Sequence, residues 1–173
     1  MLKDTVLKAL SDQVNAEYYS AYLYLAMSAC ADRMSFKGAA NWLFVQFQEE
    51  MAHGTHIYQH ILERGGMPSF GKIDPPEADF ASLTDIYQKV LSHEQHVTEL
   101  INNIATLAMQ ENDHSTYNFI MWFVNEQVEE EANADEILSK LRFMKDDASL
   151  HLNLDATLAQ RVFVDPFPPT AAN

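Results

Sequence analysis

Hydrophobic residues recur along most of this chain at alternating steps of three and four, a spacing typical of helices that bury one face. Only 5 glycines and 6 prolines occur, and they cluster between these stretches, which predicts long helices separated by a few breaks. The predicted helices cover residues of about 4–32, 36–64, 82–110, 115–143 and 149–161, and a tail marked by prolines occupies 162–173.

The breaks between the predicted helices carry recognisable start and stop residues. Ser35 is the candidate N-cap of the second helix, and Gly65 and Gly66 end that helix. Ser82, followed three residues later by Asp85, forms a capping pair that predicts the start of the third helix.

The segment 65–81 predicts a long connection rather than a turn. An extended segment of about 17 residues can reach roughly 55 Å, whereas a helix of about 28 residues is about 42 Å long. The second and third helices can therefore run parallel. The sequence predicts one all-α domain over 1–173, a four-helix bundle of two antiparallel hairpins joined by this crossover, plus a short fifth helix.

Each of the four long predicted helices has a carboxylate in the middle of its hydrophobic stripe. These carboxylates belong to Glu17, Glu50, Glu94 and Glu130. Because all four positions are central, they fall at one level of the bundle whichever way each helix runs. The sequence thus predicts a layer of four acids inside the core.

Such a layer needs positive charge, because no lysine or arginine lies on the stripes and an unpaired buried ion is strongly destabilising. Two divalent cations would neutralise four carboxylates. His53 follows Glu50 by one helical turn, and Gln127 precedes Glu130 by the same spacing, so each pair can face one metal. An oxygen-rich set with one imidazole suits iron or manganese. These residues predict a dinuclear metal site, and the alternative is a protonated or solvated group of acids.

The composition is that of a globular protein, with 47% hydrophobic and 21% charged residues. The 25 acidic residues outnumber the 11 lysines and arginines, for a net charge of -14, which argues against binding to nucleic acid or to an anionic membrane. A single cysteine, Cys30, excludes a disulfide framework. No signal peptide or membrane-spanning run is evident, and we expect a cytoplasmic protein.

The pattern of metal ligands resembles the ferroxidase centre of bacterial non-haem ferritins, which belong to the ferritin-like di-iron family. The matching positions are Glu17, Glu50-x-x-His53, Glu94 and Gln127-x-x-Glu130, with Tyr24 one heptad after Glu17. The resemblance covers nearly the whole chain, from the first helix through the fifth. It implies a ferritin-like bundle in which Glu17, Glu50 and His53 hold one iron.

The same resemblance implies that Glu50, Glu94 and Glu130 hold a second iron, with Gln127 nearby. The implied activity is oxidation of Fe²⁺ to Fe³⁺ by O2 or H2O2. The ferric mineral would be stored inside a hollow shell of roughly 24 identical subunits.

A further group of acids flanks these ligands. In bacterial ferritins the residues that match Glu49, Glu126 and Glu129 form a third iron site together with Glu130, whereas the pattern alone fits a solvated acidic face. Tyr24 points back along its helix toward the carboxylate layer. It could hydrogen-bond a ligand there and donate an electron, or it could simply fill the stripe.

Two alternatives remain open from the sequence. Bacterioferritins share most of these ligands but carry Glu-x-x-His where this chain has Gln127-x-x-Glu130, and Met51, at their haem-ligand position, predicts packing rather than haem. A di-iron oxygenase or peroxidase could use the same bundle on an organic substrate or peroxide. Other candidates are predicted to be structural: His56, His60, His93 and His96 as surface histidines, and Trp122 and Cys30 as packing residues.

Overall fold

The computed structural model describes residues 2–145 and 147–168, and within these ranges the regular structure is entirely helical. The helices are α1 (Asp4–Arg33), α2 (Lys37–Glu63), α3 (Leu83–Gln110), α4 (His114–Met144) and α5 (Ala148–Leu158). The predicted all-α fold is confirmed. Residues 169–173 of the predicted tail lie outside the described residues.

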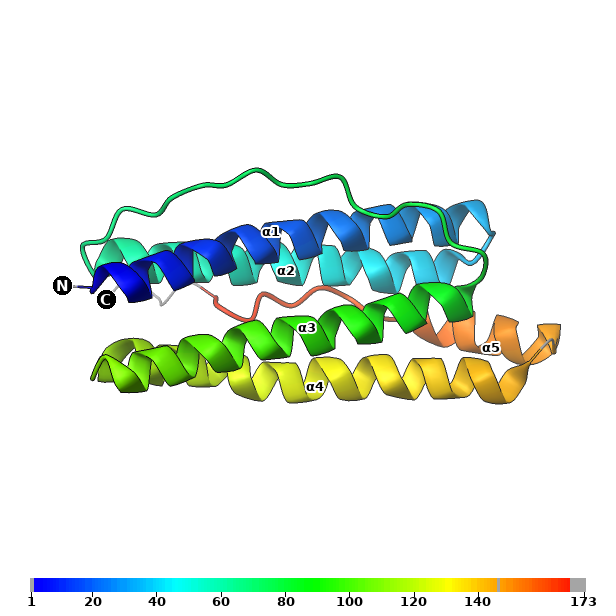
Figure 1. Cartoon of the computed structure of the whole chain (residues 1–173). Helices are drawn as coiled ribbons and strands as arrows, with labels where there is room; N and C mark the ends of the chain where they lie inside the picture. The colour runs from blue at the N-terminus through cyan, green and yellow to red at the C-terminus, as the bar shows by residue number, and fades with distance from the viewer. Residues whose placement is uncertain (1, 146, 169–173) are drawn as a thin grey trace.

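The four long helices form a bundle of two antiparallel hairpins, α1–α2 and α3–α4 (Figure 1). The connection between α2 and α3 runs along the outside of the bundle from one end to the other, so these two helices are parallel. The short helix α5 packs at the end where α4 finishes, and the chain then turns back along the bundle. The predicted crossover and fifth helix are therefore both present.

The helix ends show which local signals act. Ser82 Oγ accepts a hydrogen bond from the backbone N–H of Asp85 at 3.1 Å, and Asp85 Oδ2 accepts one from Ala81 at 3.0 Å, as the capping pair predicts. After α2, Gly65 adopts a φ of 72°, the left-handed conformation that glycine allows without strain.

The prediction that Ser35 caps α2 is wrong. Ser35 adopts a left-handed conformation with a φ of 70°, and the N-cap is Phe36, whose side chain offers no acceptor. Asp155 of α5 takes over this role, because its Oδ1 accepts the backbone N–H of Ala39 at 2.8 Å. A carboxylate from a distant helix thus accepts a backbone N–H that has no partner within α2. It also places a negative charge at the N-terminus of α2, where the helix dipole favours it.

The close contact between α2 and α5 depends on Gly38. A Cβ atom at this position would lie 1.7 Å from the backbone oxygen of Asp155. Any side chain here would push α5 away from the bundle. Helix α5 is also shorter than predicted, ending at Leu158, and Asn41 Nδ2 donates to the carbonyl oxygen of Arg161 beyond it at 2.9 Å.

The hydrophobic core consists of two clusters, one toward each end of the bundle. One contains Met27, Leu43, Ile86, Leu138 and Leu154 among others, and the other contains Leu10, Ile57, Ile101, Ile120 and Phe123 among others. The predicted carboxylate layer lies between them. No helix in the described part of the chain is long and apolar enough to cross a membrane.

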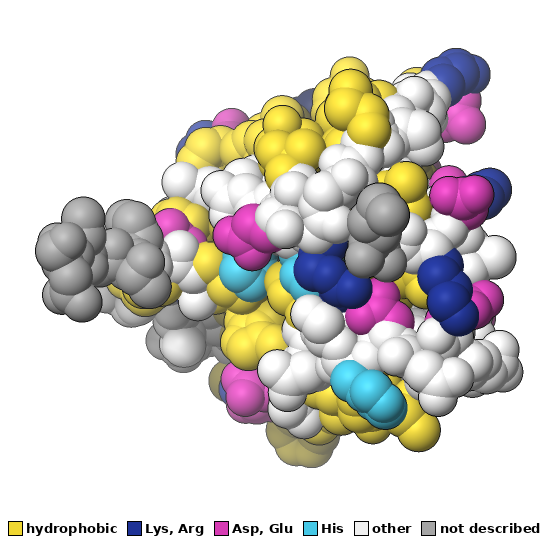
Figure 2. Space-filling view, turned by 90° about the vertical axis from the view of Figure 1, so that its left-hand side faces the viewer, with side chains coloured by type: hydrophobic (Ala, Val, Ile, Leu, Met, Phe, Trp, Pro, Cys, Tyr) yellow, Lys and Arg dark blue, Asp and Glu magenta, His cyan; other side chains and the backbone are white. Residues whose placement is uncertain are grey.

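Ion pairs close the end of the bundle that Figure 2 shows, where acidic and basic side chains lie next to one another. Lys3 Nζ lies 2.7 Å from Glu111 Oε2, and Arg64 Nη1 lies 3.0 Å from Asp113 Oδ1. These pairs join the two hairpins at the α3–α4 turn.

Candidate metal centre

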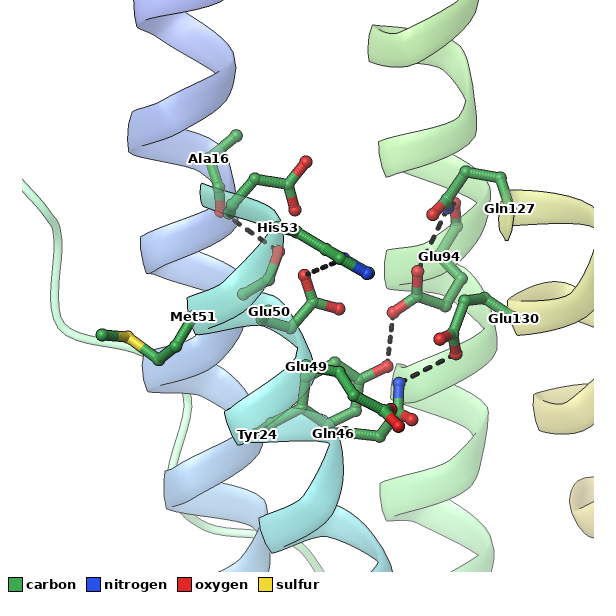
Figure 3. A network of polar contacts seen from close by, with 12 residues as sticks. Ala16, Tyr24, Gln46, Glu49, Glu50, Met51, His53, Glu94, Gln127 and Glu130 are labelled. Carbon is green, nitrogen blue, oxygen red and sulfur yellow. Dashed lines mark hydrogen bonds and ion pairs between the residues drawn. The ribbon is translucent and has the colours of Figure 1, made fainter. Parts of the chain in front are cut away.

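The four predicted carboxylates are buried in the middle of the bundle, each on a different helix. Glu17, Glu50, Glu94 and Glu130 are 1%, 2%, 1% and 4% exposed, respectively. Figure 3 shows Glu50 and His53 on one side and Glu94, Gln127 and Glu130 on the facing hairpin. The structure therefore brings these side chains to one level of the core.

Glu17, Glu50 and His53 form the tightest group. One potential ligand atom from each of these residues lies within 4.8 Å of the other two. His53 is only 3% exposed, and its ring packs edge-on against Trp122 and Phe123, with a centroid distance of 5.6 Å to each. The aromatic contacts hold the imidazole in one orientation, which a metal ligand requires.

Hydrogen bonds orient the two carboxylates on the facing hairpin. Tyr24 donates its phenolic O–H to Glu94, as the sequence allowed. Gln127 Nε2 lies 3.2 Å from the other oxygen of Glu94. Gln46 Nε2 donates to Glu130 Oε2 at 2.8 Å. Each of these carboxylates is thus fixed by a neutral donor that adds no positive charge.

Sequence reasoning missed two of the supporting glutamines. Gln46 is fully buried on α2 and precedes Glu50 by one turn, and Gln13 precedes Glu17 in the same way and donates to it at 2.8 Å. A glutamine four residues before Glu17 and another four residues before Glu50 form a pattern that the sequence does contain. The spacing of hydrophobic residues does not reveal this pattern.

Several buried atoms in this layer have no hydrogen-bond partner within the described chain. They are Glu17 Oε2, Glu50 Oε2, His53 Nε2 and Gln46 Oε1. Buried polar atoms are rarely left unsatisfied, so each such atom calls for an explanation. Carboxylate oxygens and imidazole nitrogens are atom types that bind metals, so these atoms fit a divalent cation.

The layer strongly favours the neutral forms of its acids when no cation is present. Burial is the main cause that raises the pKa of the Glu17 and Glu50 carboxyls, and neighbouring negative charges add to it. Burial and the charge of Glu94 raise the pKa of Glu130 to about 8. Burial also raises the pKa of the Tyr24 phenol, so this group stays protonated and remains a donor. A bound cation would reverse the effect on the carboxyls.

The second group of acids lies beside this layer and is less buried. Glu49 and Glu126 are partly buried and Glu129 is exposed. Glu49 Oε2 lies 2.6 Å from Arg161 Nη2. Sequence reasoning missed Arg161, because this residue was predicted to end the fifth helix, whereas α5 ends at Leu158 and Arg161 lies in the segment that follows it.

The prediction that four histidines lie on the surface holds only for His96, the one of the four that is exposed. His60 is buried and stacks on Phe119 at 3.9 Å, and His56 is half-buried. His93 is also half-buried, and its Nε2 lies 2.8 Å from Ser20 Oγ. These corrections have one cause, since aromatic side chains pack against the three histidines at positions that the stripes leave facing outward.

Three other predicted structural residues have clear positions. Trp122 packs on His53 and on Phe167, with a centroid distance of 4.4 Å to the latter. Cys30 is buried in one of the two core clusters. Met51 is 41% exposed and points away from the metal ligands in Figure 3.

Comparison with known proteins agrees with this geometry. The model of the ferritin-like domain family matches residues 7–144. The bacterial non-heme ferritin of Staphylococcus aureus (strain MRSA252) is 38% identical over 163 residues, which cover 94% of this chain and 98% of that protein. The corresponding protein of Staphylococcus haemolyticus (strain JCSC1435) is 37% identical with the same coverage.

Solved structures extend the comparison to the whole bundle. A form of the Archaeoglobus fulgidus ferritin engineered to be closed has a TM-score of 0.93 and 41% identity, covering 95% of this chain and 100% of that one. The open-pore ferritin of the same hyperthermophilic archaeon has a TM-score of 0.92 and 41% identity, with coverages of 93% and 98%. The chain described here therefore belongs to the ferritin family, and it resembles the bacterial non-haem members.

Proposed function

We propose that this chain is the subunit of an iron-storage ferritin that oxidises Fe²⁺ to Fe³⁺ at a di-iron centre within each subunit. The observation that carries the proposal is the buried group of Glu17, Glu50 and His53, in which one potential ligand atom of each residue lies within 4.8 Å of the others and each residue has a buried polar atom with no hydrogen-bond partner in the described chain. Iron is the substrate of this reaction, and the names of the bacterial relatives support that choice.

The ligands divide between two iron ions. Glu17, Glu50 and His53 hold the first, and Glu50, Glu94 and Glu130 hold the second, with Glu50 shared between them. Two Fe²⁺ ions carry four positive charges and balance four carboxylates, so the buried layer becomes neutral when it is filled. Oxidation by O2 or H2O2 raises the charge by two, and hydroxide or oxide derived from water or the oxidant can restore the balance.

The remaining residues have supporting roles in this proposal. Gln127 holds Glu94 without adding a ligand charge, which leaves room for the oxidant and for departure of the product. Tyr24, hydrogen-bonded to Glu94, can supply an electron during oxidation. Glu49, Glu126 and Glu129 form, with Glu130, a third iron site. The subunits assemble into a closed shell of roughly 24 copies, which stores the ferric mineral in the cytoplasm.

Substitution of Glu50 and His53 tests the centre. Glu50→Ala and His53→Ala should each abolish rapid oxidation of Fe²⁺, followed in a stopped-flow spectrometer by the absorbance of the ferric product. Loss of a buried acid relieves repulsion, so metal-free Glu50→Ala should keep its shell. Glu99→Ala, at a side chain that is 79% exposed on α3, is the matched control. A Glu50→Ala protein that oxidises iron at the wild-type rate would place the chemistry elsewhere.

Storage is tested separately from oxidation. After aerobic loading with Fe²⁺, light scattering gives the mass of the particle, and iron analysis gives the iron retained per chain. The proposal requires a large shell that retains many more than two irons per chain. A monomer or dimer that keeps two irons per chain would favour a di-iron oxygenase or peroxidase instead.

A further inference from the structure

The segment that follows α5 turns back and lies along the bundle beside the second group of acids (Figure 1). Asn41 on α2 donates to the carbonyl oxygen of Ala159 at 3.4 Å and to that of Arg161 at 2.9 Å. At the far end of the segment, the Phe167 ring stacks on His56 at a centroid distance of 3.6 Å and an angle of 12°. Backbone and ring contacts therefore hold the segment at both ends.

Arg161 carries the positive charge of this segment into the acid group. Its Nη2 donates to Glu49 Oε2 at 2.6 Å, and the guanidinium lies over Trp42 at 4.5 Å from the ring centroid. The two side chains of the ion pair are only 22% and 18% exposed. Water therefore screens this pair less than an ordinary surface pair.

The charge of Arg161 also reaches beyond Glu49. Burial raises the pKa of Glu49, Glu126 and Glu130, and the charge of Arg161 opposes this rise in all three. These acids, with Glu129, are the group assigned above to the third iron. Arg161 Nη1 is buried and has no hydrogen-bond partner in the described chain. The guanidinium is thus held through only one of its two terminal nitrogens, which leaves it weakly satisfied for a buried cation.

We infer that Arg161 is a built-in competitor of the third iron, which pairs with Glu49 in the metal-free protein and sets how tightly that site binds a divalent cation. The inference rests on the proposed third site. A guanidinium cannot lose its proton at any physiological pH, so the only way to free the Glu49 oxygen is to move the side chain. Iron that binds Glu49 through Oε2 must displace Arg161, and iron that binds through the other oxygen remains near its positive charge.

This competition would give the three irons of a subunit different affinities. The first two ions meet carboxylates that form no ion pair with a lysine or arginine in the described chain, whereas the third meets Glu49, which already pairs with Arg161. Iron would therefore fill the di-iron centre first and reach the third position only at higher occupancy. A third ion held loosely beside the centre can leave readily toward the mineral.

Anaerobic calorimetric titration with Fe²⁺ tests the role of the charge. In Arg161→Gln the third equivalent should bind about tenfold more tightly than in the wild type, equivalent to about 1.4 kcal/mol, while the first two equivalents keep their affinities. Arg161→Lys retains the charge and should restore the wild-type third equivalent. Asn41→Ala loosens the backbone of the segment but keeps the guanidinium, and should change the third equivalent far less than Arg161→Gln does.

These variants separate competition from simple anchoring of the segment. If Arg161→Gln and Asn41→Ala change the affinity for the third Fe²⁺ equivalent to the same extent, Arg161 acts only by holding the segment in place. The inference is then wrong. An affinity for the third Fe²⁺ equivalent that is the same in Arg161→Gln as in the wild type would also overturn the inference. If the wild type does not bind the first two Fe²⁺ ions, the proposed di-iron centre is refuted. If neither the wild type nor Arg161→Gln binds a third Fe²⁺ ion, the proposed third site is refuted.

A second measurement does not require loss of the arginine. The chain has 2 tryptophans, so in a Trp122→Phe background the fluorescence of Trp42 reports on the guanidinium above it. Titration with Zn²⁺, which does not undergo oxidation, should change this emission with the third equivalent and not with the first two. Constant emission through the third equivalent would show that Arg161 stays in place.

Discussion

Replacement of Glu130 by glutamine should stabilise the metal-free protein at alkaline pH. Glu130 is 4% exposed, and its pKa rises from an ordinary value of 4.5 to about 8 because of burial and the neighbouring charge of Glu94. In this pH range the folded chain binds a proton that the unfolded chain has lost. The stabilisation that this proton gives to the folded chain is therefore complete below pH 4.5 and declines as the pH rises toward 8.

The size of the effect follows from the same values. Each pH unit between the two pKa values removes about 1.4 kcal/mol of stability. From 4.5 to about 8, this one carboxyl therefore destabilises the fold by on the order of 5 kcal/mol. In a chain of this size, such a difference corresponds to roughly 10–20 °C in melting temperature. The glutamine keeps an oxygen that can still accept the hydrogen bond from Gln46, so packing changes little.

Differential scanning calorimetry of chelator-treated shells measures this effect at several pH values. We expect Glu130→Gln to melt well above the wild type at pH 8 and close to it near pH 5. Glu129→Gln, next along α4 but exposed, is the matched control and should leave the pH profile unchanged. If Glu130→Gln melts no higher than the wild type at pH 8, the layer does not hold destabilising charge, and the argument that it requires cations fails.

Three further predictions follow from the contacts around the layer. Tyr24→Phe should retain binding of two Fe²⁺ per chain, because no ligand is lost, but its oxidation should slow and any tyrosyl radical signal in electron paramagnetic resonance should disappear; a radical signal that persists would assign the electron to another residue. Gln46→Leu removes the donor to Glu130, and since hydrogen bonds to charged groups contribute about 1.5–3 kcal/mol, the second iron should bind at least tenfold more weakly by anaerobic titration, whereas unchanged affinity would make Gln46 a packing residue. The triple change of Glu49, Glu126 and Glu129 to glutamine should abolish the third Fe²⁺ equivalent and spare the first two; three tight equivalents would return these acids to an ordinary charged surface.

The bundle could be predicted from the sequence because its signals are local. The stripes step by three and four residues through 7–28, 43–61, 90–108 and 120–141, and these positions are all buried except Leu7 and Phe47, which are half-buried. The capping pair Ser82 and Asp85 also acts within one turn. Ser35 shows where local reasoning fails, because the acceptor at the start of α2 comes from Asp155, more than a hundred residues further along the chain.

The buried layer was predictable for a related reason. A carboxylate at the centre of a hydrophobic stripe is energetically conspicuous, and four of them demand one common explanation. The supporting glutamines were harder to find, because a neutral amide on a helix is compatible with either a buried or an exposed position. Gln13 and Gln46 become significant only when the donor atoms are seen within 2.8 Å of Glu17 and Glu130.

The count of charges along the long helices also missed one positive charge that lies close to the acids. The stripes contain four acids and no basic residue, but Arg161 reaches the neighbouring Glu49 from the segment that follows α5, outside the four long helices. Its position depends on α5, which in turn depends on the absence of a side chain at Gly38. The contact between Arg161 and Glu49 therefore depends on packing between distant parts of the chain, which the spacing of residues does not predict. It nevertheless bears on the proposed third iron site, because the positive charge of Arg161 beside these acids would make a cation bind there more weakly than at the two proposed positions in the centre of the bundle.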